Sequence, residues 1–334
     1  MSYNFIAQDI ELVNPEFSTI ETQQMYRANI KGSRYYFNKY EDSIQLYPSV
    51  THITDAMITD KYVLIELLDS LGKDKYYEMM RTKACYGTIM HRAVNEYLLS
   101  GDNYNNREIN SERINEIIIE EADKSRIDEY IRRYWLEDMK ADVKCMIMFL
   151  AEHNVEPLAI EIMGCYNDEK YKFAGAIDLI CKMDIEVKGF FGEVYKTGEK
   201  KGQPKESKRV DRIIAIVDYK SGKKGFYRGH EVQINMYKMI VEQMGVKVDK
   251  CFNVSPNETS TNYKMKDQTN VASKNKINGL LQAFYEDYKE PSEIKFIPDV
   301  LKAETQYIIL DIKGHLYNMI LKREEQLNTF KIIA

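Results

Sequence analysis

The residues from Ile213 to Gly222 have the sequence IIAIVDYKSG. The apolar run is rich in β-branched residues and predicts a strand that is buried on both faces. Because side chains alternate along a strand, Asp218 and Lys220 should share one face where the strand meets solvent. Burying either charge alone is costly, so the pair indicates a site. A plain ion pair at the strand end explains this segment equally well.

The composition of the 334-residue chain, with 44% hydrophobic and 30% charged residues, is that of a soluble globular protein. No apolar run approaches the ~20 residues that span a bilayer, and the N-terminus lacks the features of a signal peptide. The five cysteines are scattered without a CxxC pair, so reduced thiols and a cytoplasmic location are expected. The net charge of −5 argues against a surface that coats nucleic acid, but it allows a local basic groove.

The hydrophobic periodicity predicts an α/β protein in which helices come first and strands follow. Residues 33–40, SRYYFNKY, could be a strand or an interaction edge. The helices are expected at 51–80 with a stop at Gly72, at 87–99 and within 111–150. The later elements are three strands, a helix and a fourth strand, expected in that order at 158–164, 171–183, 213–220, 230–244 and 247–255.

The segment from Asp184 to Arg212 joins the second and third of these strands. Its tip, KTGEKKGQPKESKR, is rich in Lys and contains Gly and Pro, so it is too polar to bury. We favour a solvated, mobile loop over a hairpin that grips a phosphate backbone.

Asp178 lies in GAIDLIC, where an isolated acid is poorly suited to a strand interior and needs a cation or a metal as its partner. In a sheet built from hairpins, Asp178 and Asp218 can lie on adjacent strands and share one ion. A divalent cation would hold both carboxylates ionised, and all-oxygen ligation favours Mg²⁺ or Mn²⁺. Lys220 could then orient a water molecule or offset charge on a phosphorane-like transition state.

His91 flanks the apolar stripe of the helix predicted at 87–99. Taken alone, such a histidine is more often a surface or satisfied core residue than a metal ligand. Gln233 and Tyr237 are four residues apart and share a helix face, where they could be an ordinary polar pair.

Four short motifs occur in a fixed order: GTIMH at 87–91, GAID at 175–178, DYK at 218–220 and QINMY at 233–237. This ordered set resembles the PD-(D/E)XK nuclease superfamily and, within it, the RecB-like exonuclease branch. That branch has a His on a helix, followed by G-x-x-D, D-x-K and Q-x-x-x-Y on the same types of element.

The segment YPSVTHI, residues 47–53, adds to the resemblance. It is similar to a segment that precedes the nuclease core in some phage exonucleases and in the mitochondrial genome-maintenance exonuclease. It could also be only a strand end and a helix cap, with Ser49 or Thr51 as the capping residue.

The resemblance implies a restriction-endonuclease-like core, which is a central mixed β-sheet flanked by helices in the order α-β-β-β-α-β. The core is expected over residues 81–260, with the Lys-rich insertion at 184–212. Residues 1–80 would be a mixed, helical extension that contacts DNA. Residues 261–334 would be a helical region packed on the core.

The resemblance also assigns roles to individual residues. The metal would be held by His91, Asp178, Asp218 and the backbone carbonyl of Tyr219. Lys220 would be the catalytic lysine, so that Asp218 holds the metal and Lys220 faces the phosphate. Glu161 would be an outer ligand of the catalytic group or simply a strand-edge acid.

The remaining candidates surround this group. Gln233 and Tyr237 would brace the site or contact the DNA backbone, and the basic residues after the catalytic strand would hold phosphates: Lys223, Lys224, Arg228 and His230. Three aromatic residues could stack on bases, although core packing is their commoner fate: Tyr219, Phe226 and Tyr227. Glu96 could be a second acid on the His91 helix or a solvated residue.

These assignments imply a metal-dependent DNA exonuclease that acts on single strands or DNA ends in phage-type replication, recombination or repair. The alternative is a catalytically silent nuclease-fold protein that binds DNA or serves in assembly. We expect no iron–sulfur cluster, because relatives that carry one use three cysteines near the C-terminus and no cysteine follows Cys251 here. The sequence has no G-x-x-x-x-G-K-[ST] loop, so a helicase or a single-strand-binding protein would be a separate partner.

Overall fold

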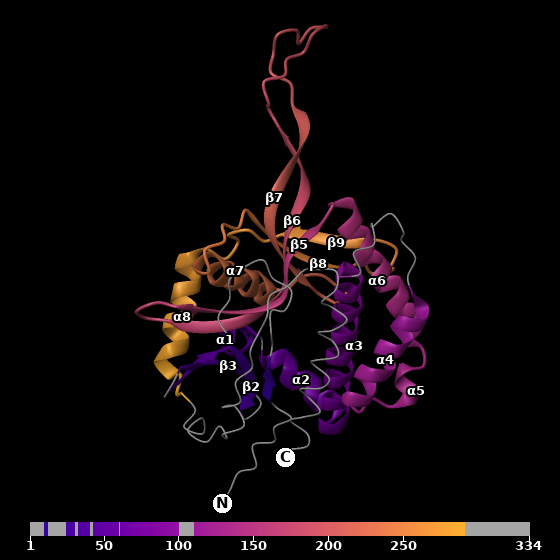
Figure 1. Cartoon of the computed structure of the whole chain (residues 1–334), viewed down its shortest axis with the longest axis vertical. Coiled ribbons are helices and arrows are strands. Elements are labelled where there is room, and N and C mark those ends of the chain that lie inside the picture. Colours follow the sequence, from indigo (N-terminus) through magenta and orange to yellow (C-terminus); the bar gives the residue numbers. More distant parts are fainter. Residues whose placement is uncertain are drawn as a thin grey trace, which may run out of the picture.

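The computed structural model describes residues 10–12, 25–30, 33–40, 43–59, 61–99 and 110–290. These residues form a four-stranded antiparallel sheet, a five-stranded mixed sheet and helices on both faces of the mixed sheet (Figure 1). No helix in these ranges is both long and apolar enough to cross a membrane.

The mixed sheet has the strand order β5-β6-β7-β8-β9. Its strands are β5 (Glu156–Asn167), β6 (Lys172–Gly189), β7 (Ser207–Tyr219), β8 (Lys250–Pro256) and β9 (Tyr263–Asp267). All neighbours are antiparallel except β7 and β8, which are joined by α7 (Arg228–Gln243). A parallel pair requires such a crossover connection. The predicted α/β class, with a mixed sheet flanked by helices, is therefore confirmed.

Helices cover both faces of this sheet. One face packs against α3 (Lys73–Leu99), α4 (Ser111–Lys124) and α6 (Trp135–Glu152), and the short α5 (Glu129–Arg132) joins the last two. The other face packs against α1 (Val50–Met57), α7 and α8 (Lys274–Asp287).

The alternation along β7 explains why its sequence is apolar throughout. Val217 and Tyr219 belong to the core under α3 and α6, whereas Ile216 belongs to the core under α7. The predicted strand with two buried faces is thus confirmed. Asp218 and Lys220 follow Ile216 in the alternation and emerge on the α7 side.

The N-terminal part, expected to be helical or mixed, contains both strands and helices. It begins with the meander β1 (Ile10–Leu12), β2 (Tyr26–Ile30), β3 (Ser33–Tyr40) and β4 (Ser43–Pro48), and only then come α1 and α2 (Lys61–Leu71). The strand at 33–40 has no alternating pattern because both of its faces are covered. Tyr35 packs edge-on against His52 of α1, whereas Tyr36 lies in a cluster with Met163 and Ala174 of the mixed sheet.

The helix that carries His91 begins earlier than predicted, at Lys73 and not at Gly87. Gly72, with φ of +77°, is the stop that the sequence predicted. Gly87 lies inside the helix, where an added Cβ would lie 3.2 Å from the hydroxyl of Ser221. This glycine therefore serves the close approach of the segment after β7, not a helix start.

The interpretation of 184–212 as a mobile loop is wrong at both ends of the segment, residues 184–189 and 207–212. β6 continues to Gly189 and β7 begins at Ser207, and the two strands stay paired along this stretch. Figure 1 shows the resulting two-stranded arm projecting away from the body of the molecule.

The predicted boundary at residue 260 is also wrong. β9 pairs with β8 from Tyr263 to Asp267 and completes the mixed sheet, so the core extends past the boundary. α8 then packs on the core as expected. Residues 291–334, the rest of the predicted C-terminal region, lie outside the described residues.

The glycine of the GAID motif is a packing requirement that can be tested. A Cβ on Gly175 would lie 2.5 Å from the Tyr237 ring. We expect Gly175→Ala to lower the free energy of unfolding by about 1–3 kcal/mol in urea titrations, because the ring must move.

Gly279→Ala is the matched control for this substitution. Gly279 is exposed in α8 and no atom lies within 4 Å of the place that a Cβ would take, so alanine should raise stability by about 0.5–1 kcal/mol through helix propensity. Equal stability of Gly175→Ala and the wild type would show that Tyr237 is not held where the structure places it.

Candidate metal centre

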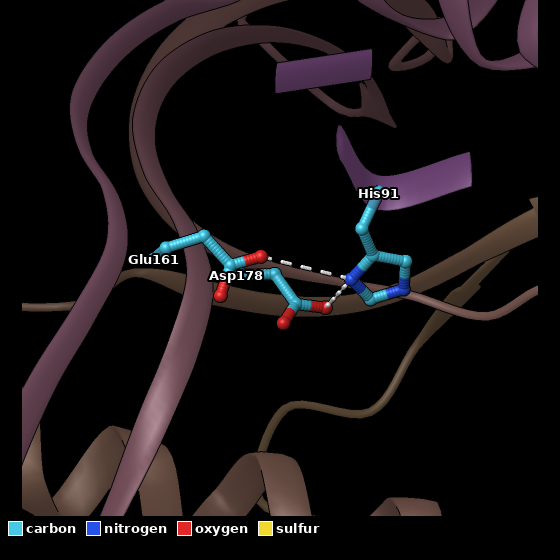
Figure 2. Close-up of side chains that lie close together, drawn as sticks. All are labelled: His91, Glu161 and Asp178. Carbon is cyan, nitrogen blue, oxygen red and sulfur yellow. Dashed lines mark ion pairs between the residues drawn. The ribbon is translucent and has the colours of Figure 1, made fainter. Parts of the chain in front are cut away.

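Three side chains from different elements converge at one point: His91 from α3, Glu161 from β5 and Asp178 from β6 (Figure 2). Their possible ligand atoms all lie within 4.8 Å of one another. Nδ1 of His91 is 3.8 Å from Oε1 of Glu161 and 3.7 Å from Oδ2 of Asp178. One nitrogen and two carboxylates thus face a common centre.

The residue Tyr219 fixes two members of this group through its backbone. Its amide N–H donates to Oδ2 of Asp178 over 2.8 Å, and its carbonyl oxygen lies 3.1 Å from Nε2 of His91. A carbonyl acceptor keeps the proton on Nε2 and leaves Nδ1 directed at the carboxylates. The Tyr219 carbonyl was predicted to be a metal ligand, but in this structure it orients the imidazole.

Glu161 reaches the centre through an unusual backbone conformation. Its φ of +51° lies in the left-handed region, which costs a non-glycine residue on the order of 1–3 kcal/mol. Asn95, one turn after His91 on α3, donates from Nδ2 to Oε1 of Glu161 over 3.2 Å. The resemblance left Glu161 as either an outer ligand or a strand-edge acid, and the structure places it within the metal-binding group.

A second cluster adjoins the first on the α7 side. Nζ of Lys220 lies 2.6 Å from Oδ2 of Asp218 and 3.0 Å from Oε1 of Gln233. Gln233 in turn donates to the hydroxyl of Tyr237 over 2.8 Å. Asn253 of β8 donates to the same Asp218 oxygen over 2.7 Å. The predicted ion pair between Asp218 and Lys220 therefore exists, and Gln233 and Tyr237 brace it.

The electrostatics of the two clusters are linked. Burial raises the pKa of Asp178 to about 7, and the charges of Asp218 and Glu161 add to this against the opposing effect of His91. Burial alone would lower the pKa of His91, but Asp178 and Glu161 outweigh it and raise the pKa to about 9. Both shifts favour a bound proton, so the surroundings attract positive charge at this point.

The pKa of Glu161 moves in the opposite direction. Burial opposes its ionisation, but His91, Asn95 and Arg27 of β2 outweigh burial and hold the pKa below its ordinary value. An ionised Glu161 beside Asp178 would give a divalent cation two oxygen ligands. Binding of the metal to Nδ1 of His91 would displace the proton from that nitrogen. The two carboxylates are ligands that suit Mg²⁺ or Mn²⁺, whereas the imidazole of His91 departs from the all-oxygen set that was expected.

Some predicted DNA-contacting residues have other partners. Lys223 forms an ion pair of 2.9 Å with Asp142 of α6, a carboxylate that is fully buried and also receives the hydroxyl of Tyr86. Tyr219 is 1% exposed and belongs to the core, so of its two expected fates, stacking on bases or core packing, the structure shows core packing. Glu96 is bound by Arg92 and Arg113 and not by the metal-binding group.

The other candidates of this kind lie on the surface. Lys224, Tyr227 and Arg228 are exposed, and Phe226 is half-buried. The ring nitrogen Nδ1 of His230 accepts the backbone N–H of Tyr227, and burial together with Lys220 lowers the pKa of His230 to about 4. His230 is therefore neutral near pH 7 and adds no positive charge to this segment.

The sequence interpretation missed several supporting residues. Asn95 lies four residues after His91 and thus on the same helix face, so helical spacing could have found it. Asn253 interrupts an apolar strand, as Asp178 does, and could have been found by the same argument. Arg27 and Asp142 had no signal in their local sequence, because only the tertiary structure brings them to their partners.

Comparison of the chain with protein-family models and with curated proteins found no match. The function is therefore argued from the geometry of these two clusters and from the resemblance of the motifs.

The pairing of Lys223 with Asp142 predicts a structural role for this lysine. Lys223→Ala would leave a fully buried carboxylate without its cation, and we expect a loss of about 3 kcal/mol in the free energy of unfolding. Lys224→Ala, next in the chain and exposed, should change stability by less than about 0.5 kcal/mol. Urea titrations of both variants measure the difference. Equal stabilities would mean that Lys223 is free for another role.

Proposed function

We propose that this protein is a metal-dependent DNA nuclease of the RecB-like branch of the PD-(D/E)XK superfamily. It would hydrolyse phosphodiester bonds in single-stranded DNA or at DNA ends, as an exonuclease. The observation that carries the proposal is the convergence of His91, Glu161 and Asp178 beside the Asp218–Lys220 pair. The motifs that contribute these residues are far apart in the sequence, and each motif alone is only weak evidence for a nuclease.

The order of the elements supports the same proposal. The helix with His91 precedes three consecutive antiparallel strands, which are followed by α7 with Gln233 and Tyr237 and by the parallel strand β8. An α-β-β-β-α-β order is what we expect of a restriction-endonuclease-like core, and the proposal takes α4, α5 and α6 as an insertion before the first strand.

In the proposed mechanism, His91, Glu161 and Asp178 would hold Mg²⁺ or Mn²⁺, and Asp218 would contribute from the adjoining cluster. A bound divalent ion supplies Lewis acidity toward the scissile phosphate and lowers the pKa of a coordinated water. Lys220 directs its ammonium group toward the phosphate, where it orients the attacking water or offsets the charge that develops in the transition state. Gln233 and Tyr237 fix the position of that ammonium group.

The proposal predicts Mg²⁺-dependent degradation of labelled single-stranded or duplex DNA. Lys220→Ala should lower kcat by about 10²–10³-fold, because it removes a preorganised charge from the transition state. Asp178→Asn should abolish turnover by removing a ligand, whereas Lys247→Ala, on an exposed position outside the site, should cleave like the wild type. Product formation on a sequencing gel measures the rates.

Two results would contradict the enzyme proposal. Identical traces for the wild type, Lys220→Ala and Asp178→Asn would assign any cleavage to a contaminant. DNA that binds but stays intact with both Mg²⁺ and Mn²⁺ would favour the alternative, a silent nuclease-fold binding protein. A helicase or a single-strand-binding protein is the class of partner that we expect for the active enzyme.

A further inference from the structure

The two-stranded arm formed by residues 184–212 contacts the body at its base, where Ile185 packs against the core and Arg212 pairs with Glu156. The structure describes every residue from 184 to 214, and none of their side chains is buried. An isolated two-stranded ribbon is at best marginally stable in water. This arm is also continuous with the catalytic sheet, since its strands are the extensions of β6 and β7 (Figure 1). Its length and position therefore indicate a function other than stabilising the fold.

Ion pairs stabilise the shaft of the arm, which is the paired part formed by residues 184–189 and 207–212. Lys208 binds Glu186 across the strands at 2.8 Å, and Arg212 binds Asp184 at 3.0 Å. Arg209 binds Asp211 at 2.7 Å and also lies over the ring of Phe191. Cross-strand pairs of opposite charge support a ribbon that lacks a core. Most charged side chains of the shaft thus form ion pairs with other residues of the arm.

The tip is an ordered hairpin and not a free loop. The backbone N–H of Tyr195 donates to the carbonyl of Gln203 over 3.1 Å, and that of Lys205 donates to Glu193 over 2.8 Å. Gly198 and Gly202 form the turns of the tip. Their φ angles near +80° are values that residues with a side chain rarely adopt. The side chains of the tip are therefore presented by a defined backbone.

The charge of the tip differs from that of the whole chain. Between the paired strands, residues 190–206 contain four Lys against three Glu, in a protein with a net charge of −5. Among the described residues, no carboxylate pairs with Lys196, Lys200 or Lys201, although Lys200 lies over the Tyr195 ring. We call these three residues the tip lysines. They form an exposed cationic group at the far end of the arm.

We infer that the tip lysines bind the phosphate backbone of the substrate DNA at a point remote from the cleaved bond. Lys is depleted from protein–protein interfaces but is a main contributor to phosphate contacts, and the exposed apolar residues of the arm (Phe190, Val194 and Val210) lie outside the segment 196–201 that carries the tip lysines. A two-stranded β-ribbon is also a shape that a DNA groove admits. This inference deepens the proposed function and rests on it for the identity of the substrate.

The arm and the candidate centre lie at opposite ends of β7. From Ser207 to Asp218 the strand advances by about 3.3 Å per residue, which is roughly 36 Å, and the tip lies beyond Ser207. DNA advances by about 3.4 Å per base pair, so one duplex must exceed about 11 base pairs to reach both places. The arm thus increases affinity for long DNA and not the rate of the chemical step.

The test compares DNA binding by the wild type and by Lys196→Ala/Lys200→Ala/Lys201→Ala. Fluorescence anisotropy with a labelled duplex of about 40 base pairs, without divalent metal, measures Kd over a range of salt concentrations. We expect the variant to bind about tenfold more weakly, with a salt slope smaller by about 2–3, because each lysine releases about 0.9 counterions. The control is Lys170→Ala/Lys247→Ala/Lys289→Ala, which removes the same charge from exposed positions on the body and should bind like the wild type.

A Kd and a salt slope equal to those of the wild type would overturn the inference, and so would an equal loss in the control variant. Cleavage adds a second measurement. The ratio of kcat/KM between duplexes of about 40 and about 8 base pairs should fall about tenfold in the tip variant. Binding is measured without turnover, so an inactive wild type would refute the proposed function alone. An active enzyme with unchanged length dependence would refute the arm alone.

Discussion

The backbone of Tyr219 makes the contact on which the site depends. Its N–H holds Asp178 and its carbonyl holds His91, so one residue at the end of β7 joins the second strand of the site to helix α3. Asp178 and Asp218 then necessarily lie on neighbouring strands, since β6 and β7 are in register up to Leu179 and Val217. Gly87, one turn before His91, lets the segment after β7 pass close to the helix. The position of α3 and the end of β7 are thus determined together.

The arrangement is costly for the fold. The buried carboxylates of Asp178 and Asp218 lie beside two cationic side chains, and the half-exposed Glu161 adopts a strained backbone conformation next to them. Such a group is stabilised by added positive charge, as the raised pKa values of Asp178 and His91 indicate. Strain and crowded charge are common at sites that bind metals or react, and rare where only stability is selected.

Much of the fold could be predicted from the sequence because its signals are local. The apolar run at 213–219, the spacing of Gln233 and Tyr237 and the stop at Gly72 each follow from a period or from a backbone preference. The start of α3 was missed because the helix was expected to begin at Gly87, whereas the lack of a side chain at this position serves a tertiary contact. The aromatic strand 33–40 was ambiguous because burial on both faces removes the alternation that identifies a strand.

The sequence could nominate the residues of the candidate site but not their contacts. Residue type and order brought together His91, Asp178, Asp218 and Lys220, but they could not show that the Tyr219 carbonyl faces an imidazole. They also could not show that Lys223 is engaged by Asp142, since these residues are 81 positions apart in the sequence. The arm was misjudged because a polar, Lys-rich segment has the same composition whether it is a loop or a solvated ribbon.

The central claim is that His91, Glu161 and Asp178 form a divalent-cation site beside a lysine that is not a ligand. Calorimetric titration of Mg²⁺ or Mn²⁺ into the wild type, Asp178→Asn and Lys220→Ala tests this most directly. The account predicts one saturable site in the wild type, its loss in Asp178→Asn and its retention in Lys220→Ala. Equal metal affinity in the wild type and Asp178→Asn, or equal loss in both variants, would contradict it.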